Sequence, residues 1–197
     1  MPLWKTTDTD TDGAKPKYIQ KDPHIANTDV YATNQGWVHR KTYTDMHGNT
    51  RTKDEILVAI RGLAGAGKLA AATIVDARLS TTTMTVRKTA NVIVTWNEQV
   101  DVNGVPTLTL VAANTTANTV PASLTASYVS GSGTNRLKFN FVADANNATY
   151  TLNTVTIANT QTLGICDSLT TSVASDLTIP ADYTGANSAV GTVTATA

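Results

Sequence analysis

Residues Arg136-Leu137-Lys138-Phe139-Asn140-Phe141-Val142 give the clearest indication of the fold. Polar and apolar residues alternate along it, and a period of two is typical of a β-strand with one buried face. Leu137, Phe139 and Phe141 are therefore expected to point into a core. The stretch predicts one strand of an all-β protein.

Similar short strands surround this one at regular spacing. They are predicted at residues 91–96, 107–111, 125–129, 136–142 and 149–157, with weaker strands after residue 163. Threonine, which is β-branched and suits strands, occupies 37 of the 197 positions. Because six or seven short strands within one domain are typical of an immunoglobulin-like β-sandwich, residues 90–197 are predicted to form one.

Residues 36–89 are predicted to form a small β-domain that contains a hairpin. Residues 36–44 alternate, residues 45–49 have the composition of a turn, and residues 50–60 form the returning strand. The returning strand is polar near the turn and apolar towards residue 60. The hairpin should therefore have a polar tip and a buried base, and further strands are expected at 71–75 and 81–86.

Residues 1–35 are predicted to form an extended arm. Prolines at positions 2, 16 and 23 and a polar run over residues 6–12 leave too little apolar surface for an independent core. The arm is expected to become ordered on a foreign surface through four apolar anchors, which are Trp4, Tyr18, Ile19 and Tyr31.

The charge distribution predicts a boundary near residue 90. The chain has no formal net charge, which argues against a partner held mainly by phosphate contacts, such as nucleic acid. Residues 1–89 nevertheless contain 13 basic and 9 acidic side chains, and residues 90–197 contain 2 and 6. The two parts should therefore form separate units, with residues 90–197 able to fold alone.

The hairpin contains a cluster of basic side chains, Arg40, Lys41, Arg51 and Lys53. Acidic residues stand beside them, so we expect pairing with acidic groups of a neighbouring subunit rather than with phosphate. Together with Trp37 and the four anchors of the arm, these side chains form the predicted docking set.

The chemical motifs in the chain are incomplete, and we predict no catalytic residue, metal or cofactor. The run Gly62-Leu63-Ala64-Gly65-Ala66-Gly67-Lys68 has the spacing of a P-loop, but Leu69 replaces the Ser or Thr that binds Mg²⁺. The run Asp8-Thr9-Asp10-Thr11-Asp12-Gly13 resembles half of a calcium loop whose twelfth position, Ile19, has no carboxylate. The three histidines lack metal-ligand spacing, and the single Cys166 has no cysteine to pair with.

No targeting segment is recognised in the sequence. The first residues lack the apolar region of a signal peptide, and no run reaches the roughly 18 apolar residues of a membrane span. Synthesis in a cytoplasm without export by an N-terminal signal is therefore expected.

Two parts of the chain resemble known families. The segments Val92-Ile93-Val94-Thr95-Trp96-Asn97-Glu98-Gln99-Val100, Asn103-Gly104-Val105-Pro106-Thr107-Leu108-Thr109-Leu110 and Ala126-Ser127-Tyr128-Val129-Ser130-Gly131-Ser132-Gly133-Thr134 resemble bacterial and phage immunoglobulin-like repeats. The resemblance covers about the last 105 residues, in a single copy. In the front part, Thr33-Asn34-Gln35-Gly36-Trp37-Val38 and Tyr43-Thr44-Asp45-Met46-His47-Gly48-Asn49 are similar to small virion proteins of marine tailed phages.

These resemblances imply a non-enzymatic structural protein of a tailed-phage virion, made in the host cytoplasm. The simplest assignment is a capsid decoration protein that docks through residues 1–89 and projects the immunoglobulin-like domain. Its expected partners are the major capsid protein or neck and tail proteins and further copies of itself, without nucleic acid or membrane. A neck or tail component is one alternative. The other is a module that binds carbohydrate or a cell surface, for which the aromatic candidates are Trp96, Tyr128 and Tyr150.

Overall fold

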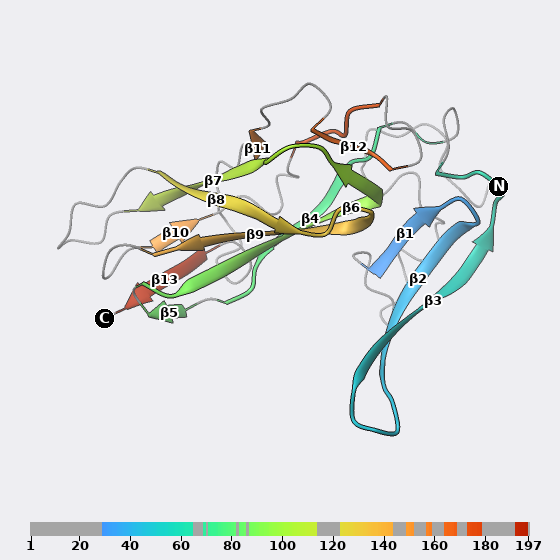
Figure 1. The fold of residues 1–197 in the computed structure, drawn as a ribbon, viewed down its shortest axis with the longest axis horizontal. Helices are drawn as coiled ribbons and strands as arrows, with labels where there is room; N and C mark the ends of the chain where they lie inside the picture. The colour runs from blue at the N-terminus through green and yellow to red at the C-terminus, as the bar shows by residue number, and fades with distance from the viewer. Residues whose placement is uncertain are drawn as a thin grey trace, which may run out of the picture.

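The computed structural model confirms an all-β fold, because every regular element in the described part of the chain is a strand. The structure describes residues 29–64, 69, 71–81, 83–85, 87–113, 123–143, 149–151, 157–158, 164–168, 173–178 and 192–196. Hydrogen bonds join these strands into one mixed sheet. They pack around two separate cores, and we therefore describe a hairpin unit (β1–β3) and a large unit (β4–β13) (Figure 1).

The hairpin unit consists of β1 (Val30–Thr33), β2 (Gly36–Thr44) and β3 (Thr50–Ala59) in antiparallel order. The predicted hairpin is confirmed, including its polar tip. In the turn between β2 and β3, the Asp45 side chain accepts hydrogen bonds from the backbone N–H groups of His47 and Asn49. The base of the unit has a small core of its own, made of Val30, Ala32, Trp37, Leu63 and Ala64.

The large unit contains β4 (Ile74–Leu79), β5 (Thr83–Thr85), β6 (Thr89–Val102), β7 (Thr107–Ala113), β8 (Ser123–Ser130), β9 (Thr134–Val142), β10 (Thr149–Thr151), β11 (Ile157–Ala158), β12 (Ile165–Asp167) and β13 (Thr192–Thr196). Its main hydrogen-bonded order is β6-β9-β8-β7-β10-β13-β5. Strands β4 and β12 pair with β6, and β11 pairs with β7. Most of the predicted strands are present, and β6 is longer than expected.

The core of the large unit contains the three side chains of β9 that the alternation predicted to point inward. Leu137 and Phe139 are fully buried and Phe141 is 3% exposed, so all three inward positions of β9 contribute to one cluster. Tyr128 of β8 packs edge-on against Phe139, with ring centroids 6.0 Å apart. Burial of such aromatic and aliphatic side chains is the main stabilising contribution to a core of this kind.

The boundary of the core does not coincide with the change in charge near residue 90. Strand β4 pairs with β6, and β5 pairs with β13 in parallel. Ala72, Ile74, Ala77 and Met84 lie in the same buried cluster as the residues of β9. Residues 72–85 therefore belong to the large unit, although their composition resembles that of the front part.

The arm is also shorter than predicted. Residues 30–33 form a strand within the hairpin unit, and the Thr33 side chain accepts a hydrogen bond from the backbone N–H of Gln35 in the turn that follows. Residues 29–35 are therefore part of a folded unit, and the rest of the predicted arm lies outside the described residues.

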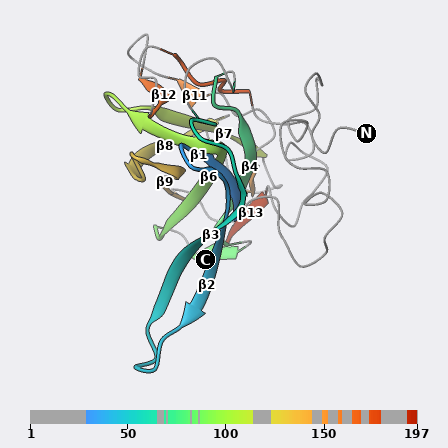
Figure 2. The ribbon, with the colours of Figure 1, turned by 90° about the vertical axis from the view of Figure 1, so that its right-hand side faces the viewer.

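The two units meet at an irregular point of β6. The β6–β9 ladder shifts register between Thr95 and Val100, and in this gap Glu98 pairs in parallel with Ala32 of β1. From there the β2–β3 hairpin extends away from the large unit, as both Figure 1 and Figure 2 show.

Replacing Gly36 by Ala is expected to destabilise the hairpin unit by about 2 kcal/mol or more. Gly36 has a φ of +134°, and a Cβ added there would lie 2.0 Å from the backbone oxygen of Val58. Gly48 provides the matched control, because it has a φ of +80° and a Cβ added there would meet no atom within 4 Å. Gly48→Ala should cost only about 1 kcal/mol. Equal losses in urea unfolding would contradict the close approach at Gly36.

A fragment of residues 71–197 is expected to unfold cooperatively, whereas a fragment of residues 90–197 should not. The shorter fragment lacks β4, which pairs with β6, and β5, which pairs with β13. It also lacks the side chains that these strands contribute to the core. Thermal unfolding followed by circular dichroism compares the two fragments. Equal cooperativity would show that β4 and β5 are dispensable to this core.

Candidate docking surface and the joint behind it

The predicted docking residues fall into three groups in the structure. Trp4, Tyr18 and Ile19 lie outside the described residues. Tyr31 and Trp37 are each 1% exposed, so the chain itself already covers them. The expectation that Tyr31 needs a foreign surface is wrong, and Trp37 is not accessible for docking. The basic side chains of the hairpin are described in full and separate onto its two faces.

One face of the projecting hairpin is basic. The register places His39 opposite Glu55, Lys41 opposite Lys53, and Tyr43 opposite Arg51, all on the same side of the two strands. We call this side the basic face. It has three basic side chains and one acidic side chain, and Tyr43 is half exposed. The face therefore combines positive charge with an accessible aromatic ring.

Part of the charge on the basic face is already paired. Lys41 forms an ion pair with Glu55, and Arg51 forms one with Asp45 of the turn at 3.1 Å. Lys53 lies directly opposite Lys41 and makes no ion pair with another described residue. Like charges on opposing positions repel each other, so Lys53 would gain from an acidic group supplied by a partner.

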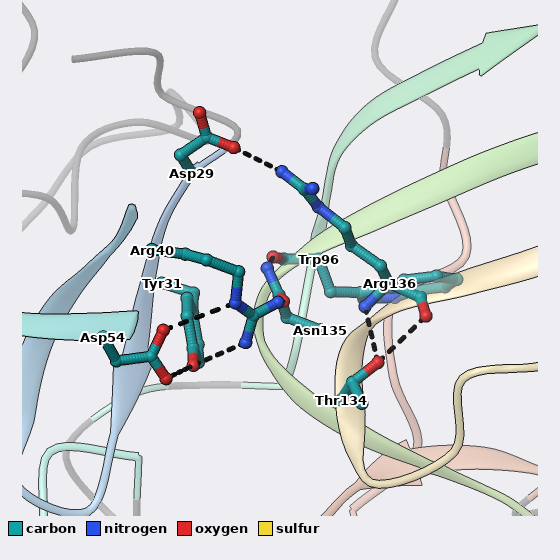
Figure 3. A network of polar contacts seen from close by, with 8 residues as sticks. All are labelled: Asp29, Tyr31, Arg40, Asp54, Trp96, Thr134, Asn135 and Arg136. Carbon is teal, nitrogen blue, oxygen red and sulfur yellow. Dashed lines mark hydrogen bonds and ion pairs between the residues drawn. The ribbon is translucent and has the colours of Figure 1, made fainter. Parts of the chain in front are cut away.

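Arg40 lies on the other face and points towards the large unit (Figure 3). Its guanidinium donates hydrogen bonds to the Tyr31 hydroxyl at 2.7 Å, to Asp54 at 3.3 Å and to the side chain of Asn135 in β9 at 3.0 Å. It also lies 4.6 Å from the centre of the Tyr31 ring. Arg40 therefore joins the two units, which corrects its assignment to a docking surface.

Tyr31 is the centre of this polar network. Its hydroxyl donates to Asp54 while accepting from Arg40. Burial, followed by the hydrogen bond to Asp54, raises the pKa of Tyr31 to about 12. The hydroxyl consequently keeps its proton at neutral pH. It therefore always donates to Asp54 and accepts from Arg40.

Two further contacts complete the joint between the units. Arg136 of β9 forms an ion pair with Asp29, which directly precedes β1 (Figure 3). Asn135 is 1% exposed, and its side-chain nitrogen donates to the backbone oxygen of Trp96 at 3.4 Å. Neighbouring residues of β9 thus contact β2 and the residue just before β1, which restricts how the units tilt against each other.

Glu98 is a buried ionisable residue at the joint that the sequence did not single out. It is fully buried, and neither carboxyl oxygen has a hydrogen-bond partner among the described residues. Burial, with a smaller effect of the nearby Asp167 carboxylate, raises the pKa of Glu98 to about 8. The sequence shows only a glutamate within the strand-like run of residues 92–100. A glutamate at an exposed position of a strand would give the same pattern, so the sequence could not indicate that Glu98 is buried.

The other predicted features give no site in the described part of the chain. Cys166 is buried, and burial raises the pKa of its thiol. No group of three metal-ligating side chains occurs among the described residues. The acidic run at residues 8–13 and residues 65–68 of the glycine-rich run lie outside them. Trp96 is fully buried and cannot stack on a sugar, and the side chain of Tyr150 is not described.

The native protein is expected to lose stability as pH rises, because Glu98 becomes ionised. The Glu98→Gln variant should not show this loss. Because the folded-state pKa is raised from 4.5 to about 8, the stabilising contribution is complete below pH 4.5 and disappears as pH increases to about 8. At pH 8.5 the variant should be more stable than the native protein by on the order of 2 kcal/mol. Urea unfolding between pH 5 and 9 measures this difference.

The control is Glu55→Gln, since Glu55 is exposed and the hydrogen bond from Lys41 lowers its pKa. This variant should retain the native decrease in stability between pH 5 and 8. Parallel pH profiles for Glu98→Gln and the native protein would rule out titration of Glu98 in this range.

Comparison with known proteins found no matching family model, no matching curated protein and no matching solved structure. Within the described residues, no helix is long and apolar enough to cross a membrane.

Proposed function

We propose that this chain is a non-enzymatic structural protein of a tailed-phage virion, most simply a capsid decoration protein. In this proposal the hairpin unit and the residues before it attach to the particle, and the large unit projects. The observation that carries the proposal is the hairpin itself, which extends from a separately packed base and exposes a basic face to solvent.

The immunoglobulin-like character of the large unit is part of the same proposal. Immunoglobulin domains place strands A, B, E and D in one sheet and C, F and G in the other. If β4, β6, β7, β8, β9, β10 and β13 correspond to A to G, the observed neighbours β4-β6-β9-β8 and β7-β10-β13 follow these two orders. The β7–β8 ladder departs from the pattern, because it connects the two groups.

The contacts of the hairpin support a narrower attachment surface than the predicted one. Lys41, Arg51 and Lys53 share the basic face with Tyr43, whereas Tyr31, Trp37 and Arg40 stabilise the chain from within. The partner should therefore present acidic side chains. A deletion that tests the arm should stop at residue 28, because Val30 and Tyr31 belong to β1.

A neck or tail component with the same division of labour is the second candidate. The exposed hairpin fits it equally well, and the number of copies per particle distinguishes the two. Shell decoration requires copies in the hundreds, and a neck ring requires about a dozen.

Lys41→Glu combined with Lys53→Glu is expected to lower co-sedimentation with particles lacking the protein by at least about tenfold, because like charges across an interface are strongly unfavourable. The loss should be greatest at low salt, where screening is weakest. Lys88→Glu combined with Lys138→Glu makes the same charge change on exposed positions of the large unit and should leave binding unchanged. Undiminished binding of the first variant would exclude the basic face as the attachment surface.

A further inference from the structure

The joint between the hairpin unit and the large unit is built differently from the interior of either unit. Each unit has its own buried apolar cluster, and the two clusters are separate. The joint itself includes polar contacts, which are the backbone bridge of Ala32 with Glu98, the hydrogen bond of Arg40 with Asn135 and the ion pair of Asp29 with Arg136. Such contacts contribute less to stability than apolar burial does. We therefore expect the joint to open more readily than either unit unfolds.

Glu98 lies at the centre of this joint. The β6–β9 ladder stops at Thr95 and resumes at Val100, and in this interruption Glu98 pairs with Ala32 of β1. Both Glu98 and Ala32 are fully buried, and neither carboxyl oxygen of Glu98 has a hydrogen-bond partner among the described residues. Because β1 lies directly beside Glu98, opening the joint would admit water to the carboxyl group.

The enclosed environment of Glu98 opposes its ionisation. Burial, with a smaller effect of the Asp167 carboxylate of β12, raises the pKa of Glu98 to about 8. Asp167 is itself only 5% exposed. Asp101, further along β6, accepts a hydrogen bond from the Ser168 hydroxyl at 3.1 Å. The charged group that acts on Glu98 is therefore negative, and it adds to the effect of burial.

The other titratable side chains on the surrounding strands have partners of their own. These pairs are Arg40 of β2 with Asp54, Tyr31 of β1 with Asp54, His39 of β2 opposite Glu55, Arg136 of β9 with Asp29, and Arg78 of β4 with Asp76. A carboxylate formed at Glu98 would thus be a buried charge without a donor, which is strongly destabilising. Opening the joint relieves this charge without exposing either core.

We propose that Glu98 is a pH-sensitive switch of the joint. While Glu98 is protonated, the hairpin unit stays docked on the large unit. When Glu98 loses its proton, the joint opens and water hydrates the carboxylate, while both units remain folded. The inference does not depend on the proposed virion function, because it concerns a contact within one chain.

The direction of the effect follows from proton binding. The closed joint holds the proton of Glu98 more tightly than the open joint, in which the pKa of the carboxyl group returns towards 4.5. Rising pH therefore favours the open form. The opening equilibrium should increase by on the order of a hundredfold between pH 6 and pH 9.

The test is hydrogen exchange of the full chain, followed by mass spectrometry between pH 6 and pH 9. After correction for the chemical exchange rate, it measures how often each segment opens, including openings that are rarely populated. Residues 30–33 and 96–99 report on the joint, and residues 137–141 of β9 report on unfolding of the large unit. The joint should open at least about tenfold more often than residues 137–141 at pH 9.

Four variants separate the switch from a general loss of stability. Glu98→Gln should remove the pH dependence of joint opening, and Glu55→Gln, which changes an exposed carboxyl group, should retain it. Arg40→Gln removes a joint contact without changing Glu98, so it should increase opening at every pH and leave the pH dependence in place. Asp167→Asn should make the increase level off at lower pH, because Asp167 raises the pKa of Glu98.

Three results would overturn the proposal. The first is exchange in the joint that is no faster than in residues 137–141 at pH 9, because the joint would then open only when the large unit unfolds. The second is joint opening that does not change with pH. The third is the native pH dependence in Glu98→Gln or, if that variant does not fold, an unchanged dependence in Asp167→Asn.

Discussion

Strand β6 pairs on both of its sides, and this double pairing connects the two units. This strand of 14 residues pairs with β4 and β12 and also with β9 and β1. Its inward side chains, such as Val92, Val94 and Trp96, are fully buried in the main core. Because β6 pairs with strands of both units, the register shift in its ladder with β9 determines where the hairpin unit attaches.

That irregularity explains why polar side chains collect between the two units. A regular ladder would hydrogen-bond β9 to β6 along its whole length, but the register shift between Thr95 and Val100 leaves room for β1. Arg40, Asn135 and Tyr31 satisfy one another across this gap. Glu98 does not find a partner there among the described residues, so it keeps its proton at neutral pH because of its burial.

The hairpin protects its exposed edge strand with charged side chains. Within the described sheet β3 has β2 as its one neighbour, and charged residues Arg51, Lys53, Asp54 and Glu55 follow one another closely along it. Charged side chains on an edge strand discourage indiscriminate addition of further strands. A partner with complementary charge would still be accepted, which agrees with an attachment role and with the polar composition of the tip.

Local patterns in the sequence determined the class of fold and much of its detail. The alternation in residues 136–142 and the turn at Asp45 and Gly48 are properties of neighbouring residues, and the strands and hairpin predicted from them are present. Tertiary structure decided the rest. Residues 72–85 join the large unit, Tyr31 and Trp37 become buried, Arg40 separates from Lys41 and Lys53, and Glu98 becomes enclosed beside Ala32. Each of these outcomes depends on which distant strand pairs with which and where a bulge shifts the register, and a period of two along one strand contains no information about its partner.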